Sequence, residues 1–194
     1  MTPVAVGFRV KSGYAIAVAL RGPASAPEPI VRLVVQLSDP DVAETRQPYH
    51  DGFYKNENDA RIVARRVRII ERCTKRSVAD LVKALGRVPG DGRVRAALVV
   101  GSVIDPTHVG NPHIRAHASE GRLFRTVLES ALRTHDIACD IIVEKQLAQR
   151  AAIGLRCPEG EIRRTLAAFG KTLGGTWRAE EKAASTAAWL ALVN

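Results

Sequence analysis

The chain has 194 residues, of which 46% are hydrophobic and 25% charged, so we expect one folded domain over residues 1–194 rather than a disordered segment. No apolar run approaches the ~20 residues that span a bilayer, and the first residues lack the pattern of a signal peptide. Three cysteines (Cys73, Cys139 and Cys157) lie far apart without a CxxC pair, which argues against a zinc knuckle or a disulfide framework. We therefore expect a cytoplasmic protein without a membrane partner.

The net charge of +9 favours polyanionic partners, either nucleic acid or an acidic protein. An arginine-rich proteome gives the same total without such a partner, so the distribution of the charge matters. Between Arg61 and Arg95 there are 11 basic and 3 acidic residues, and this segment holds nearly all of the excess.

The first 58 residues predict three strands and a long loop. Residues 4–10 and 14–20 are short apolar runs, and the glycine-containing turn at 11–13 joins them as a hairpin. Residues 30–39 form a third run, rich in β-branched side chains, and the loop 41–58 has no clear period.

A long amphipathic helix follows. Asn58 is the expected N-cap of a helix from Asp59 to about Leu85, which Gly86 ends. Arginines recur every three or four residues along one stripe: Arg61, Arg65, Arg68, Arg72 and Arg76. Apolar residues fall on the other side: Ile62, Val63, Val67, Ile70 and Cys73. The apolar side predicts packing on a sheet.

The second half alternates strands and helices. After a turn at 88–92, the continuous apolar run 95–104 predicts a strand buried on both faces. Asn111 and Pro112 begin a helix to about Thr134. The remaining elements are a strand at 138–144 and helices at 158–174 and 179–193. This order, β-β-β-α-β-α-β-α-α, predicts an α/β fold with a mixed five-stranded sheet flanked by helices.

This element order resembles the ribonuclease H-like superfamily, particularly its Holliday-junction resolvase branch. The stretch "VGFRVKSGYAIAV" keeps residues of the first hairpin of those resolvases: Gly7, Phe8, Ser12, Gly13 and Tyr14. The resemblance implies their fold. It also implies, for an intact member, two divalent cations, Mg²⁺ or Mn²⁺, held by several carboxylates that activate water.

The carboxylate positions of the family are substituted. Arg9 stands where the first strand of the resolvases has a catalytic aspartate, and a guanidinium cannot ligate a metal. Ser185 occupies the position of a second aspartate on the last helix, with Glu181 one turn earlier. Gly101 and Ser102 occupy the place of the glutamate on the fourth strand. The resemblance therefore implies the fold without its metal site.

His113, His117 and Glu120 form the first candidate site. Offsets of four and three residues place them on one helix face, a spacing that suits a metal or a catalytic group. The same face continues as core with Phe124, Val127, Leu128 and Ala131, so we favour a structural hydrogen-bond network over a metal. The start of this helix, with Arg115 in its first turn, is also a candidate anion site, although a solvent-capped start is the simpler interpretation.

The carboxylates Asp105, Glu144 and Glu181 form a second candidate, a relocated metal cluster after strands four and five and on the last helix. A buried Glu181 needs a partner, and we prefer a structural ion pair between Arg9 and Glu181 over a metal cluster. The arginine stripe of the long helix is the third candidate, for sequence-independent binding to phosphates. The loop residues Arg46, Gln47, Tyr49 and His50 indicate no particular reaction.

Three hypotheses follow. The first is a ribonuclease H-like protein without the usual nuclease site, with no cofactor and a basic surface for nucleic acid or an acidic partner. The alternative is a metal-dependent nuclease that uses relocated ligands such as His113, His117, Glu120 and Asp105, with Glu144 and Glu181 as further carboxylates and Mg²⁺ or Mn²⁺ as cofactor. The third is a structural or oligomer-forming domain whose charge serves solubility.

Overall fold

The first two strands pair as the sequence predicts. In the computed structural model, which describes residues 2–52, 55–86 and 94–193, β1 (Val4–Lys11) and β2 (Tyr14–Arg21) form an antiparallel hairpin. Lys11 pairs with Tyr14, so Ser12 and Gly13 alone make the turn. Gly13 has φ +85°, a left-handed conformation that a two-residue hairpin turn requires and that glycine adopts without strain.

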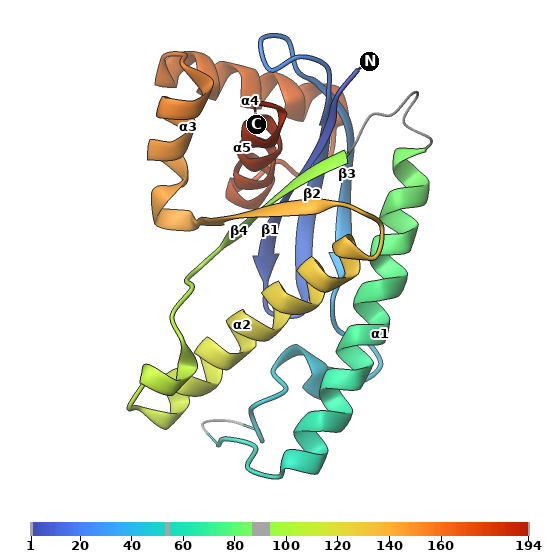
Figure 1. Cartoon of the computed structure of the whole chain (residues 1–194), viewed down its shortest axis with the longest axis vertical. Coiled ribbons are helices and arrows are strands. Elements are labelled where there is room, and N and C mark those ends of the chain that lie inside the picture. Colours follow the sequence, from blue (N-terminus) through green and yellow to red (C-terminus); the bar gives the residue numbers. More distant parts are fainter. Residues whose placement is uncertain (1, 53–54, 87–93, 194) are drawn as a thin grey trace.

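The five strands form one mixed sheet in the order β3-β2-β1-β4-β5 (Figure 1). β3 (Glu28–Gln36) pairs antiparallel with β2, whereas β4 (Val94–Val100) and β5 (Ala138–Val143) run parallel to β1. The predicted α/β class and the meander followed by alternating elements are therefore confirmed. β4 ends four residues earlier than predicted, at Val100, and the chain leaves the sheet there.

Helices cover both faces of the sheet. On one face lie α1 (Ala60–Leu85) and α2 (Pro112–Arg133), whose side chains Ile70, Phe124 and Leu128 pack with Phe8 and Leu98 of the strands. On the other face lies α5 (Ala179–Val193), with α3 (Leu147–Leu155) and α4 (Glu159–Leu173) beside it (Figure 1). The nine-residue α3 was not predicted. No helix in the described part of the chain is long and apolar enough to cross a bilayer.

α1 begins one residue later than predicted. Asp59, not Asn58, is the N-cap, and its carboxylate accepts hydrogen bonds from the backbone N–H groups of Arg61 (2.7 Å) and Ile62 (3.4 Å). With 26 residues α1 is about 39 Å long, whereas the eight-residue β1 extends about 27 Å, so the first turns of α1 continue past the sheet. This explains why Ile62, on the predicted apolar face, is 41% exposed. The predicted turn at 88–92 lies outside the described residues.

α2 begins as predicted. Pro112 is its first residue, and the side chain of Asn111 accepts a hydrogen bond from the Ile114 backbone N–H at 3.1 Å. The predicted inward stripe is confirmed, since Glu120, Phe124 and Leu128 are all buried. Glu120 is thus a carboxylate within a core face.

Candidate functional site at the carboxyl ends of the central strands

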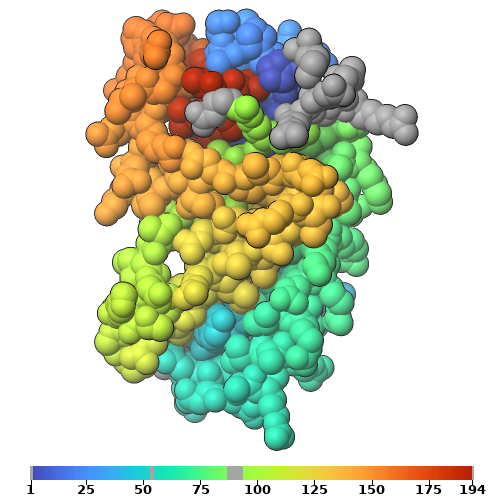
Figure 2. Space-filling view, viewed as in Figure 1, coloured from blue at the N-terminus to red at the C-terminus, as the bar shows by residue number. Residues whose placement is uncertain are grey.

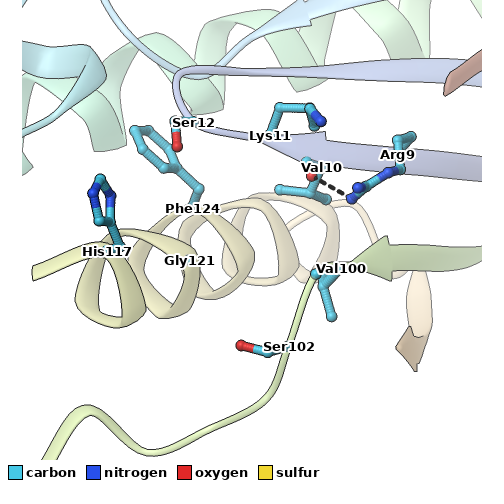
Figure 3. Close-up of a pocket in the computed structure, with 10 residues that line it drawn as sticks. Arg9, Val10, Lys11, Ser12, Val100, Ser102, His117, Gly121 and Phe124 are labelled. Carbon is cyan, nitrogen blue, oxygen red and sulfur yellow. Dashed lines mark hydrogen bonds between the residues drawn. The ribbon is translucent and has the colours of Figure 1, made fainter. Parts of the chain in front are cut away.

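A pocket of about 300 Å³ lies where β1 and β4 end. Because the two strands are parallel neighbours, their carboxyl ends meet at the same edge of the sheet, where α/β proteins usually bind ligands. Ten residues line the pocket (Figure 3): Arg9, Val10, Lys11, Ser12, Val100, Gly101, Ser102, His117, Gly121 and Phe124. Figure 2 shows an opening between the segment after β4 and α2. The lining contains two cations and two hydroxyls but no carboxylate.

Arg9 is the buried cation of this pocket, 6% exposed. Its guanidinium donates hydrogen bonds to the carbonyl oxygens of Val10 (2.9 Å; Figure 3) and Val99 (3.4 Å) and to the Glu144 carboxylate at 2.6 Å. The predicted ion pair between Arg9 and Glu181 is therefore wrong. Arg9 reaches along the strand ends toward β5, and Glu144 is the first residue after β5.

Glu181 lies on α5 with a different partner. Its carboxylate, on a residue 2% exposed, accepts a hydrogen bond from Arg32 of β3 at 2.5 Å and one from the Arg178 backbone N–H at 2.9 Å. Burial by itself raises the pKa of Glu181, but these hydrogen bonds outweigh it and hold the pKa below its usual 4.5. Ser185, the other substituted family position, is fully buried and donates its hydroxyl to the Glu181 carbonyl at 2.8 Å.

The lowered pKa of Glu181 predicts a pH-dependent contribution to stability. A carboxyl with a depressed pKa in the folded state stabilises the protein fully above its unfolded value, and this contribution is lost as pH falls through the folded value. We expect Glu181→Gln to lose stability at pH 6 and to show a smaller further loss than wild type between pH 5 and pH 3. Urea midpoints across this range test it, with the exposed Glu159→Gln as control. Equal acid sensitivity of wild type and Glu181→Gln would contradict the assignment.

Asp105 does not join the other carboxylates. It caps a short 3₁₀ turn by accepting from the Thr107 backbone N–H (3.0 Å) and hydroxyl (2.8 Å), and these hydrogen bonds lower its pKa. Its ion pair, at 3.5 Å, is with Arg122. Asp105, Glu144 and Glu181 therefore pair with three different arginines, and the described residues bring no three carboxylates together as a metal group. The predicted relocated carboxylate cluster does not form.

The helix stripe of His113, His117 and Glu120 gains a partner from the loop before α1. The Nδ1 atom of His50 lies 2.8 Å from Glu120 Oε1, and the His50 ring centroid lies 4.6 Å from that of His117 and 5.4 Å from that of His113. His113 and His117 approach each other to 3.3 Å between their Nε2 atoms. Sequence reasoning missed His50 as a member of this group, because no spacing rule joins residues 63 or more positions apart. Arg115 instead donates to the carbonyl oxygens of Val109 (2.8 Å) and Gly110 (3.0 Å).

Comparison with known proteins identifies the fold. No family model and no curated protein matches the chain. Among solved structures, RuvC of Thermus thermophilus is similar over 96% of this chain and 92% of its own, with a TM-score of 0.52 and 12% identity. The same protein in complex with Holliday junction substrate matches over 97% and 92%, with a TM-score of 0.53 and 12% identity. The fold is ribonuclease H-like. The resemblance seen in the first hairpin is thus confirmed at the level of structure.

The residues of this ribonuclease H-like domain do not fit a pair of divalent cations at the usual place. The buried guanidinium of Arg9 stands there with its counter-ion Glu144, and the pocket beside it has no carboxylate among its described lining residues. A divalent cation next to Arg9 would meet charge repulsion without compensating oxygen ligands.

The predicted arginine stripe is on the surface of the ribonuclease H-like domain. All five guanidinium groups of the stripe (Arg61, Arg65, Arg68, Arg72 and Arg76) belong to exposed residues, and none makes an ion pair with another described residue. By contrast Arg66, on the inner side of α1, pairs with Glu57 at 3.3 Å and donates to two loop carbonyls. The stripe is thus available to an external anion.

Proposed function

We propose that this protein binds nucleic acid through its phosphates and does not hydrolyse it by the two-metal chemistry of its fold. The observation that carries the proposal is the buried Arg9 at the carboxyl end of β1, paired with Glu144 and forming a wall of the pocket. It places a fixed positive charge where phosphodiester chemistry would need carboxylates and metal.

The remaining pocket residues support an anionic ligand. Lys11 supplies a second cation, and Ser12 and Ser102 supply hydroxyl groups that donate to phosphate oxygens. One of the similar solved structures is in complex with Holliday junction substrate, which favours nucleic acid over an acidic protein as the partner. Contacts of this kind hold the backbone and do not read base sequence.

The arginine stripe of α1 provides the test. Changing Arg61, Arg65, Arg68, Arg72 and Arg76 together to Gln is expected to weaken binding to branched and linear DNA about 10- to 100-fold at ~0.1 M salt and to reduce the salt dependence, by about 0.9 in slope for each lost phosphate contact. Fluorescence anisotropy over a salt series measures both quantities.

A matched control removes the same charge elsewhere. Five exposed basic residues outside α1 serve this purpose when changed to Gln: Arg156, Arg163, Arg164, Lys171 and Lys182. We expect this variant to keep most of the affinity. Equal losses in the two variants would reduce the stripe to bulk charge, and absence of salt-dependent binding by wild type would overturn the proposal.

The alternative function, a metal-dependent nuclease with relocated ligands, has one observation in its favour: His113, His117 and Glu120 meet at one place with His50. Incubation of branched and single-stranded DNA with Mg²⁺, Mn²⁺ and Zn²⁺ tests it. Cleavage that His117→Ala abolishes would replace the first proposal, whereas binding without cleavage across the series supports it.

A further inference from the structure

Three of the five histidines converge from two segments of the chain. One ring nitrogen from each of His50, His113 and His117 lies within 4.8 Å of the others, and this is the one group of three metal-ligating residue types in the described ranges 2–52, 55–86 and 94–193. The Nε2 atoms of His113 and His117 are 3.3 Å apart. Two nitrogens on a tetrahedral Zn²⁺, each at about 2.0–2.1 Å, are separated by about 3.3 Å as well. The spacing of this pair matches that of metal ligands.

Glu120 orients two of the rings. Its Oε1 lies 2.8 Å from His50 Nδ1 and its Oε2 lies 3.4 Å from His117 Nδ1, and the carboxylate is 1% exposed. With Nδ1 held, each ring presents Nε2 away from the carboxylate. In metalloproteins a histidine ligand commonly donates its second ring N–H to a carboxylate, which fixes the tautomer and increases ligand basicity.

His50 supplies an independent indication of a ligand. Its side chain is 7% exposed, and its Nε2 atom is buried with no hydrogen-bond partner among the described residues. A buried ring nitrogen without a partner loses the hydrogen bond that water would give it, a cost of about 1–3 kcal/mol. A metal ion bonded to Nε2 removes this cost.

We propose that His50, His113 and His117 bind a Zn²⁺ ion, with Glu120 as the residue that positions His50 and His117. Three imidazole ligands without a carboxylate in direct contact select zinc-like transition metals over Mg²⁺, Mn²⁺ or Ca²⁺, which prefer oxygen ligands. Three protein ligands leave one position of a tetrahedral ion for water or an anion. His117 is 48% exposed and also lines the pocket of Arg9, so the ion lies at the wall of that pocket.

The experiment measures metal directly on the full chain, so its outcome is separate from that of the DNA-binding test. Protein stripped with EDTA is titrated with ZnCl₂ by calorimetry and with CoCl₂ by visible absorption. We expect one equivalent of either ion, at least a 100-fold weaker affinity in His113→Ala and His117→Ala, and a weakening of about 10- to 100-fold in Glu120→Gln with the stoichiometry retained.

Two histidines outside the cluster give matched controls. His108 and His135 are exposed, and His108→Ala and His135→Ala are expected to bind Zn²⁺ like wild type. Zn²⁺ is also expected to raise the melting temperature of wild type and His135→Ala but not of His117→Ala, whose exposed position permits folding. Absence of saturable binding below about 100 µM Zn²⁺, or full binding by His117→Ala, would overturn the proposal and leave a metal-free hydrogen-bond network.

Discussion

Metal-free Glu120→Ala is expected to unfold with a free energy about 3 kcal/mol lower than that of wild type. Glu120 is 1% exposed, and its carboxylate faces both His50 and His117. Removing it leaves a cavity in the inward face of α2 and takes the hydrogen-bond partner from the Nδ1 atom of a buried His50. The loss combines a packing term with the desolvation of an unpaired polar group.

Urea denaturation at neutral pH, with EDTA present, measures this loss. Glu129→Ala is the matched control, because Glu129 lies on the same helix, is partly exposed and has only a distant ion pair with Arg125 at 3.9 Å. An ion pair of that kind contributes at most about 1 kcal/mol. Similar midpoints for the two variants would show that the Glu120 carboxylate does not hold the loop against α2.

The sequence predicts the half of this site that lies on one helix. The 3.6-residue period places His113, His117 and Glu120 on a face that continues into core side chains, and the structure buries Glu120 as this pattern requires. The partner His50 comes from a loop without a period, 70 positions before Glu120. Its contact depends on the path of the loop across the start of α2, which no local pattern encodes.

The partner of Arg9 shows a related limit. The apolar first strand and the substituted aspartate position predict a buried cation at the end of β1, and Arg9 is there. The choice between Glu144 and Glu181 depends on which way the side chain turns at the strand end. The parallel order β1-β4-β5 brings Glu144 to the same edge as Arg9, while Arg32 on β3 already pairs with Glu181. Strand order and side-chain direction are tertiary properties, so residue spacing alone does not determine the pair.

The fold itself depends on how closely α5 approaches the sheet, and Gly7 sets that approach. A Cβ atom at Gly7 would overlap the carbonyl oxygen of Ala184 and the amide nitrogen of Ala188, which are backbone atoms of α5. Both alanines are fully buried. Relief would require the whole helix to move away from β1, because no flexible side chain is available to turn aside.

Gly7→Ala is therefore expected to lower the free energy of unfolding by about 3 kcal/mol or more, near the upper end for a single added methyl group. Gly160→Ala on α4 is the matched control, since its Cβ would first meet the end of Arg164 at 3.6 Å and alanine favours the helix. Urea midpoints of the two variants should shift in opposite directions. A Gly7→Ala protein as stable as wild type would mean that α5 can lift from the sheet at little cost. The close packing of alanines on glycine would then not be what holds the second layer in place.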